Sequence, residues 1–152
     1  MIKLNLPEYQ FKTRVSASGK DEIFDEIRRK YIVLTSEEWV RQNFLRYLKE
    51  EKGYPQMLIA VEKGITVNSM QKRFDAVVYG RAGMPIVLIE FKSTEVKINQ
   101  KVMEQISRYN LNLKVPYLVV SNGLTHYCCI INSKSAEITF LEEIPKFTDL
   151  KS

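Results

Sequence analysis

Two neighbouring apolar segments constrain the fold of this chain more than any other feature. Residues 74–79 (FDAVVY) and 86–91 (IVLIEF) are separated by the turn sequence GRAGMP. Each segment is short, rich in β-branched residues, and apolar at successive positions rather than at alternate ones. A strand of this composition is buried on both faces. The sequence therefore predicts a hairpin at the centre of a sheet that is covered on two sides.

The segment before this hairpin predicts a helix. Thr35 is followed three residues later by Glu38, which is the capping-box pattern of a helix start. Val40, Phe44 and Leu48 then recur at helical spacing. The run Gly53-Tyr54-Pro55 predicts the end of this helix, because glycine favours the left-handed conformation that closes helices and proline cannot continue them.

The segments after the hairpin complete the pattern. A second helix is predicted over about residues 99–113, ending before Pro116, with one apolar stripe formed by Val102, Ile106, Tyr109 and Leu113. Short apolar runs predict further strands at residues 57–61, 117–121, 126–131 and 137–141. The expected class is α/β, a central mixed sheet flanked by helices, in the order one helix, three strands, one helix, then strands (αβββαβ).

Some segments leave their conformation open. Residues 1–20 are expected to form a partly ordered leader, residues 21–34 fit a short helix or an extended segment, and residues 63–72 fit a polar loop or the rim of a hairpin. The length of 152 residues predicts one domain. We expect residues 1–152 to form it, with residues 1–34 as an N-terminal extension and residues 35–131 as the core.

Composition excludes several classes of protein. No apolar run reaches membrane-spanning length and the N-terminus lacks a signal-peptide pattern, so we expect a cytoplasmic protein without a membrane partner. Cys128 and Cys129 are adjacent, and in a strand they would point to opposite faces as free thiols. One histidine, His126, is too few for a histidine-rich metal site or a Ser-His-Asp triad. The formal net charge of +5 is compatible with nucleic-acid binding.

Charged residues interrupt the two central strands at one end. Glu90 and Lys92 are two residues apart, so both side chains leave the same face of a strand. If Tyr79 pairs with Ile86 across the turn, Val77 faces Leu88 and Asp75 falls opposite Glu90. Two facing carboxylates repel each other, and burial raises the cost.

A hard divalent cation would neutralise such a pair, because Mg²⁺ prefers carboxylate and water oxygens. It would lower the pKa of a bound water and stabilise charge on a phosphodiester, while Lys92 orients the water or stabilises the developing negative charge. The alternative is a structural rim at which Lys92 pairs with Glu90 or Asp75. Charge placement alone leaves both interpretations open.

The same residues resemble a known family. Arg73-Phe74-Asp75 followed by Ile89-Glu90-Phe91-Lys92 resembles the D…(D/E)xK signature of the PD-(D/E)xK nuclease superfamily. The order of motifs over about residues 30–131 further resembles the N-terminal nuclease domain of type I restriction enzyme R subunits. The segments that carry this wider resemblance are TSEEWVRQ at 35–42, GYP at 53–55, Gln105 with Tyr109, and SNG at 121–123.

The resemblance implies a restriction-endonuclease-like core and roles for individual residues. Asp75, Glu90 and the backbone carbonyl of Phe91 would bind the metal, Mg²⁺ or Mn²⁺, and Lys92 would be catalytic. The strict motif has proline before the aspartate, where this chain has Phe74. That departure removes no chemical group.

The resemblance also implies an acidic residue on the first helix, which is Glu37 or Glu38 here. Glu37 is spaced three and seven residues before Val40 and Phe44, which places it slightly better toward the sheet. Glu38 has the competing capping role. Either acid could instead simply favour the positive end of the helix dipole. Glu62, at the end of the first strand, is a lower-ranked acid.

Gln105 and Tyr109 match the QxxxY pattern of these nucleases, and at i and i+4 they share one side of the second helix. They could contact DNA or support Lys92, or else Tyr109 belongs to the core and Gln105 to the surface. Basic residues near the motif in sequence could contact DNA phosphates, although a solvated charged face is the default for each. These are Lys72, Arg73, Lys97, Lys101 and Arg108.

The leading hypothesis is a Mg²⁺-dependent DNA endonuclease domain with restriction-system or motor subunits as partners. The sequence contains no GxxxxGK(S/T) phosphate-binding loop of an ATPase motor. The alternative is a catalytically inactive DNA-binding or assembly module on the same fold. A small-molecule binding protein with a deep apolar pocket is a further alternative. The sequence does not define the oligomeric state.

Overall fold

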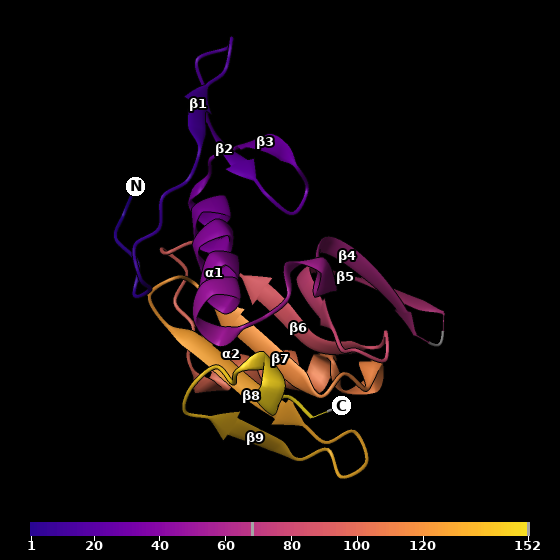
Figure 1. The fold of residues 1–152 in the computed structure, drawn as a ribbon. Coiled ribbons are helices and arrows are strands. Elements are labelled where there is room, and N and C mark those ends of the chain that lie inside the picture. The colour runs from indigo at the N-terminus through magenta and orange to yellow at the C-terminus, as the bar shows by residue number, and fades with distance from the viewer. Residues whose placement is uncertain (68, 152) are drawn as a thin grey trace.

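The computed structural model describes residues 1–67 and 69–151 as two sheets and their covering helices (Figure 1). A three-stranded antiparallel sheet has the order β1-β2-β3, and a six-stranded mixed sheet has the order β4-β5-β6-β7-β8-β9. Within the described part of this sheet, β6 and β7 are the one parallel pair. The bounds are β1 Thr13–Val15, β2 Asp21–Asp25, β3 Lys30–Val33, α1 Ser36–Lys52, η1 Gln56–Leu58, β4 Ile59–Val67, β5 Met70–Tyr79, β6 Pro85–Phe91, α2 Gln100–Tyr109, η2 Leu111–Leu113, β7 Tyr117–Ser121, β8 His126–Ile131, β9 Ile138–Leu141 and η3 Phe147–Asp149.

The six-stranded sheet is covered on two sides, as the sequence predicts. Val40 and Phe44 of α1 pack with Ile89 and Phe91 in one buried cluster. Met103 of α2 packs with Leu88 and Leu118 in the other. Figure 1 shows α1 and α2 lying against opposite faces of the sheet. Successive residues of β6 therefore point into different cores, which explains why this strand has no alternating polar face.

The central hairpin has the predicted register over most of its length. Val77 pairs with Leu88 and Ala76 pairs with Ile89. The expected pairing of Tyr79 with Ile86 is wrong, because an irregularity after Val78 pairs Tyr79 with Pro85. The irregularity lies beside the turn, where an extra residue is accommodated without disturbing the rest of the ladder.

Helix α1 begins and ends as expected. The Thr35 side chain accepts a hydrogen bond from the Glu38 backbone N–H at 3.0 Å. Gly53 adopts a φ of 71°, and its N–H bonds to the carbonyl of Leu48. Only half of the capping box is used, since the Glu38 carboxylate accepts instead from Gln42 at 2.9 Å. That carboxylate is therefore directed along the helix and into the protein.

The N-terminal region is more ordered than the sequence predicts. Most of residues 13–33 lie in strands β1, β2 and β3, so the extended alternative for residues 21–34 is correct and the leader interpretation of residues 1–20 is incomplete. Figure 1 shows this sheet beside the start of α1, apart from the six-stranded sheet. Three strands precede α1 and two follow β7, so the order αβββαβ does not describe the whole chain.

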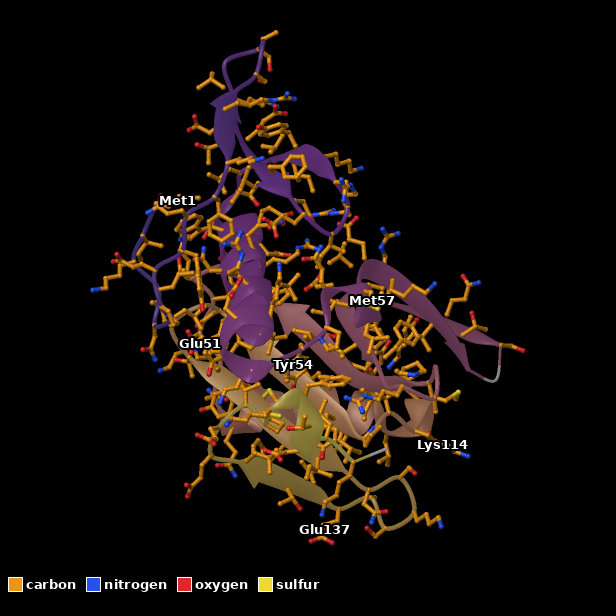
Figure 2. All side chains as sticks on the ribbon, in the orientation of Figure 1. Met1, Glu51, Tyr54, Met57, Lys114 and Glu137 are labelled. Carbon is orange, nitrogen blue, oxygen red and sulfur yellow. The ribbon has the colours of Figure 1, made fainter. Side chains whose placement is uncertain are left out.

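Two further boundaries differ from expectation. Residues 63–72 largely continue β4 and β5, so the hairpin alternative is correct, and the strand predicted from Met57 begins at Ile59 instead. Met57 lies in the short helix η1 and is 89% exposed (Figure 2). The ladder with β5 starts only where Ile59 pairs with Val78. Without a strand partner, Met57 has no apolar surface to cover it.

Helix α2 is shorter than predicted and its buried side is different. Asn99 caps its start, and Met103 and Ser107 are its buried residues. Tyr109, expected on the apolar stripe, is 71% exposed. Ser107 is buried because its hydroxyl donates to the carbonyl of Met103 at 2.7 Å, which satisfies the polar group within the helix.

The two adjacent cysteines point to opposite faces of the sheet, as predicted. Cys128 belongs to the cluster beneath α1 and Cys129 to the cluster beneath α2, and both thiols are free. Burial raises the pKa of Cys128 to about 12, so this thiol stays protonated at neutral pH. Among the described residues, no helix is both long and apolar enough to cross a membrane.

Candidate functional site

The predicted acidic residues meet where β5 and β6 leave the regular ladder. Ala76 pairs with Ile89, so the next position along each strand is Asp75 on β5 and Glu90 on β6. The Asp75 carboxylate accepts a hydrogen bond from the Phe91 N–H at 2.7 Å. This bond holds the side chain of Asp75 across the gap between the two strands. The structure thus brings Asp75, Glu90 and Phe91 together.

The pKa of Glu90 reflects its burial and the nearby carboxylate of Asp75. Burial raises its pKa, and the charge of Asp75 raises it further, while the positive charges of Lys92 and Lys72 oppose the shift. The ionised form is therefore disfavoured by its surroundings despite two nearby ammonium groups. A pair of this kind has unused capacity to bind a positive charge.

Lys92 lies on the same side of the sheet as Glu90. Phe91 points into the core beneath α1, so the residues on either side of it point toward the α2 side. The Lys92 N–H donates to the carbonyl of Ser121 on β7 at 2.9 Å, which extends the parallel ladder past the end of β6. The backbone at Lys92 is therefore fixed by the sheet, while its side chain is only partly buried.

The donor set at this point is small. Within residues 1–67 and 69–151 no group of three or more histidine, cysteine, aspartate or glutamate side chains is arranged to hold a metal ion. The available protein oxygens are those of Asp75 and Glu90 and the main-chain carbonyl of Phe91. Mg²⁺ fits a set of this size, because it usually keeps several waters and is bound through one or two carboxylates.

The preference for Glu37 on the first helix is wrong. Glu37 is exposed, whereas Glu38 is buried. The spacing of Glu37 to Val40 and Phe44 identifies only the side of α1 that faces the six-stranded sheet. The N-terminal sheet also packs on this helix, and the side of α1 that carries Glu38, Arg41 and Gln42 is buried beneath it.

Arginines surround Glu38 and Glu62, and sequence reasoning missed this cluster. Arg28, in the β2–β3 turn, lies 3.2 Å from Glu38 and 3.4 Å from Glu62. Arg41 of α1 lies 3.3 Å from Glu38 and 3.8 Å from Glu62. The run Arg28-Arg29-Lys30 is visible in the sequence, but nothing in it shows which acids it meets. We call these four residues, Arg28, Glu38, Arg41 and Glu62, the arginine cluster.

Asp25 anchors Arg28 from the N-terminal side. Its carboxylate accepts hydrogen bonds from the N–H groups of Ile27 and Arg28 and from Nε of Arg28, at 2.8, 2.9 and 2.7 Å. Burial alone would raise the pKa of Asp25, but the hydrogen bonds from Arg28 and the charge of Arg28 outweigh burial and lower it. Asp25 is therefore a structural acid that orients Arg28.

On α2, Gln105 and Tyr109 are both exposed at one helical spacing, as the QxxxY pattern requires. Tyr109 is joined to β5 by Lys72, whose ammonium donates to the Tyr109 carbonyl at 2.6 Å and lies 3.3 Å from the centre of its ring. Lys72 also donates to the side chain of Asn110 at 3.0 Å. Its burial lowers its pKa, and the charge of Glu90 opposes that shift. Lys72 thus links α2 to the acidic pair.

The other predicted phosphate contacts differ in availability. Lys97, Lys101 and Arg108 are exposed, on the loop before α2 and on α2 itself. Arg73 is exposed but its guanidinium lies 3.3 Å from the Glu62 carboxylate. Part of the charge of Arg73 is therefore compensated within the protein, whereas Lys97, Lys101 and Arg108 are exposed to solvent.

One sizeable pocket of the described chain lies elsewhere. An open and mainly apolar pocket of about 650 Å³ is bordered by the β5–β6 turn, Pro116 and the C-terminal segment around Phe147 (Figure 2 labels Lys114 beside it). This turn follows Tyr79 of β5 and leads into Pro85 of β6, whereas Asp75 is in the middle of β5 and Glu90 is near the far end of β6. The pocket is therefore not part of the candidate site.

Comparison with known proteins gives the class. The model of the family described as "Type I restriction enzyme R protein N terminus (HSDR_N)" matches residues 36–145. The fold is similar to a fragment of a protein assigned as an HsdR subunit of a type I restriction enzyme from Vibrio vulnificus YJ016, with a TM-score of 0.52 and 22% identity. That match covers 77% of this chain and 24% of the Vibrio chain, so the present chain spans about a quarter of its structural neighbour.

A search of curated protein sequences gives no significant match. The mixed α/β fold of this chain is thus similar to that of the HsdR fragment. This chain belongs to the type I restriction enzyme R protein N-terminal family.

Proposed function

We propose that this chain is a metal-dependent DNA endonuclease domain of the PD-(D/E)xK type. The observation that carries the proposal is the acidic pair Asp75 and Glu90 where the buried β5–β6 ladder ends, with Lys92 on the face of Glu90. Family membership supports the restriction-enzyme context. DNA as substrate, and restriction or motor subunits as partners, are parts of this proposal.

In the proposed site, Asp75 and Glu90 hold Mg²⁺ or Mn²⁺ together with the carbonyl of Phe91. The Phe91 N–H faces Asp75, and in an extended strand the carbonyl of the same residue points to the same side. When bound, the metal lowers the pKa of a water and stabilises the charge that develops on the phosphodiester. The hydrogen bond from Phe91 occupies one oxygen of Asp75 and leaves the other for this role.

Lys92 contributes a positive charge beside Glu90. In this proposal its ammonium orients the attacking water and stabilises negative charge on the phosphate in the transition state. Lys72 stays bonded to Tyr109 and Asn110, so we assign it to the support of the site rather than to DNA. Gln105 and Tyr109 line the approach from α2, and Lys97, Lys101 and Arg108 bind flanking phosphates.

Nicking of supercoiled plasmid in Mg²⁺ or Mn²⁺ tests this proposal directly. The wild-type chain is expected to nick the plasmid, and Lys92→Ala and Glu90→Ala are expected to lose activity by about a hundredfold or more. Glu95→Ala, an exposed acid in the loop after β6, is the matched control and should retain activity. Equal nicking by the wild type and Lys92→Ala would identify a contaminating nuclease and overturn the assignment.

The alternative is an inactive DNA-binding or assembly module on the same fold. Calorimetric titration with Mg²⁺ separates the two functions. A nuclease domain takes up the cation at the acidic pair, and Glu90→Gln abolishes this uptake. DNA binding without any Mg²⁺ uptake that depends on Glu90 would establish the module instead.

A further inference from the structure

We infer that Arg41 is a positioning residue for Asp75, and that the N-terminal sheet holds Arg41 in place through Arg28. This inference rests on the proposed nuclease function for its meaning, but its central claim is structural. It assigns residues 13–33 a part in shaping the candidate site, instead of the role of a peripheral extension.

The backbone of Asp75 lacks its regular strand partner. In the described part of the β4–β5 ladder, Val61 pairs with Ala76 and Lys63 pairs with Phe74, but Glu62 does not pair with Asp75. Glu62 has a φ of 50°, in the left-handed region that side chains other than glycine rarely adopt. This conformation interrupts the ladder at Asp75, the residue proposed to bind the metal.

At this interruption, Arg41 supplies a hydrogen bond to the backbone of Asp75. Its Nη1 donates to the carbonyl of Asp75 at 3.2 Å. The Arg41 side chain is 6% exposed, so the bond lies inside the protein, where an unpaired carbonyl is costly. The carboxylate of Asp75 is held on the other strand by the Phe91 N–H. Asp75 is thus fixed at both its main chain and its side chain.

Arg41 in turn depends on acids that Arg28 shares. Glu38 and Glu62 each lie between the two arginines, with N–O distances from 3.2 to 3.8 Å. Arg28 is oriented by Asp25 at the end of β2. A continuous series of charged contacts therefore runs from the N-terminal sheet through the arginine cluster to Asp75.

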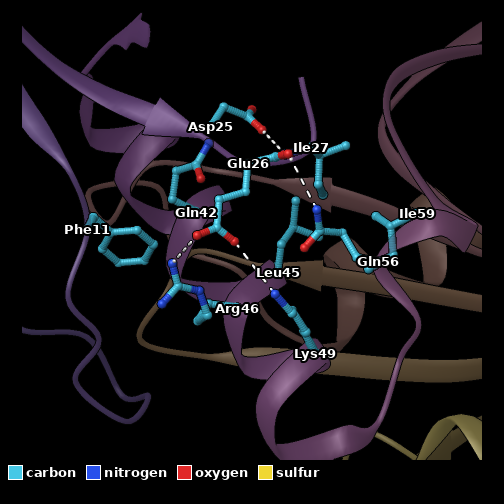
Figure 3. Close-up of a pocket in the computed structure, with 10 residues that line it drawn as sticks. All are labelled: Phe11, Asp25, Glu26, Ile27, Gln42, Leu45, Arg46, Lys49, Gln56 and Ile59. Carbon is cyan, nitrogen blue, oxygen red and sulfur yellow. Dashed lines mark hydrogen bonds and ion pairs between the residues drawn. The ribbon is translucent and has the colours of Figure 1, made fainter. Parts of the chain in front are cut away.

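The N-terminal sheet has a second attachment to α1 that does not reach Asp75. Glu26 lies between Arg46 and Lys49 of α1, at 3.3 and 3.6 Å, and its carbonyl accepts from Gln56 (Figure 3). Arg46 is on the same helix as Arg41 and is the same residue type. This attachment provides a matched control, because disturbing it removes an ion pair of the same helix without removing a contact of the arginine cluster or of β5.

The test compares Arg41→Lys with Arg46→Lys. Lysine keeps the positive charge beside Glu38 and Glu62, so the variant is designed to fold, but one ammonium cannot replace a guanidinium that reaches two acids and a carbonyl. Hydrogen exchange resolved by NMR is followed at the Phe91 amide, which reports directly on the bond to Asp75. Leu88, in the middle of β6, is the reference amide.

We expect Arg41→Lys to speed exchange at Phe91 by about tenfold relative to Leu88, because loss of the carbonyl contact loosens Asp75. Arg28→Lys should act in the same direction, and Arg46→Lys should leave Phe91 unchanged. Unchanged exchange at Phe91 in Arg41→Lys overturns the inference. So does an equal acceleration in Arg46→Lys, which would mean that the N-terminal sheet acts only on general stability.

A kinetic measurement completes the test. If the wild type nicks plasmid, Arg41→Lys should lower kcat and leave the KM for DNA unchanged, since Arg41 is too buried to contact DNA. A raised KM with unchanged kcat contradicts a positioning role. If the wild type does not nick, the proposed function fails while the exchange experiment still decides the inference about Arg41.

Discussion

The arginine cluster and the acidic pair meet at Asp75, and they differ in how the negative charge of their acids is compensated. In the arginine cluster, Glu38 and Glu62 each contact two or three guanidinium groups. In the acidic pair, burial and the charge of Asp75 raise the pKa of Glu90, and the positive charges of Lys92 and Lys72 only oppose this shift. Acids whose charge is balanced by arginines stabilise the fold, whereas acids whose charge is not balanced can still bind a positively charged ligand. The same substitution should therefore have opposite effects in the two clusters.

The largest expected effect is that of Glu38→Gln. The change leaves the buried Arg41 and the partly buried Arg28 with one fewer counter-charge, so the free energy of unfolding should fall by about 3 kcal/mol. Urea denaturation followed by circular dichroism measures this. Glu37→Gln changes the exposed neighbour on the same turn, and it should stay within about 0.5 kcal/mol of the wild type. Equal effects of the two variants would contradict the distinction between them.

Asp25→Asn tests the acid that orients Arg28, and its effect should depend on pH. At neutral pH we expect a loss of about 2 kcal/mol, because three hydrogen bonds to a charged acceptor are weakened. The pKa of Asp25 is lowered in the folded protein, so its contribution is present above the unfolded value of about 4 and is lost as pH falls through the folded pKa. The difference between wild type and variant, from urea denaturation over a pH series, should therefore shrink in acid. A difference that is constant with pH would show that the charge of Asp25 is not what matters.

The acidic pair could be predicted from the sequence, while the arginine cluster could not, and the reason is physical. Asp75 and Glu90 interrupt apolar strands joined by a short turn, so local pairing rules bring them together, and the register holds from Val78 to Ala76. The arginine cluster joins a turn at Arg28, a helix at Glu38 and a strand at Glu62. The strands that carry its N-terminal end are only three to five residues long and lack a clean apolar alternation.

The wrong predictions for residues on the two helices have a related cause, because local spacing does not show which other segments cover a helix. Spacing favours Glu37 only if α1 has a single covering surface, whereas α1 is covered by two sheets. On α2, Ser107 is polar yet buried, so a stripe drawn through apolar residues alone was rotated toward Tyr109. Local patterns thus predicted the elements and the ends of α1, but not which of its sides the N-terminal sheet buries.

A smaller effect is expected at the start of α1. Thr35→Ala removes the side-chain acceptor for the Glu38 N–H and should lower the free energy of unfolding by about 1 kcal/mol. Thr35→Ser keeps the acceptor oxygen and should restore most of that loss. If the cap mattered only because it places Glu38 in the arginine cluster, Thr35→Ala would have no effect in a Glu38→Gln background. Thermal denaturation of the double variant measures this coupling.

The smallest effect on stability, and the sharpest contrast with Glu38→Gln, is expected for Glu90→Gln. Because the pKa of Glu90 is raised in the folded protein, its ionised form costs stability at neutral pH, and a neutral amide removes that cost. The free energy of unfolding should therefore stay the same or rise by at most about 1 kcal/mol, while calorimetric uptake of Mg²⁺ is lost. A large destabilisation would instead place Glu90 with the structural acids, in a salt-bridged rim with Lys92. If Glu90→Gln retains stability but loses cation binding, Glu90 serves to bind a ligand and does not stabilise the fold.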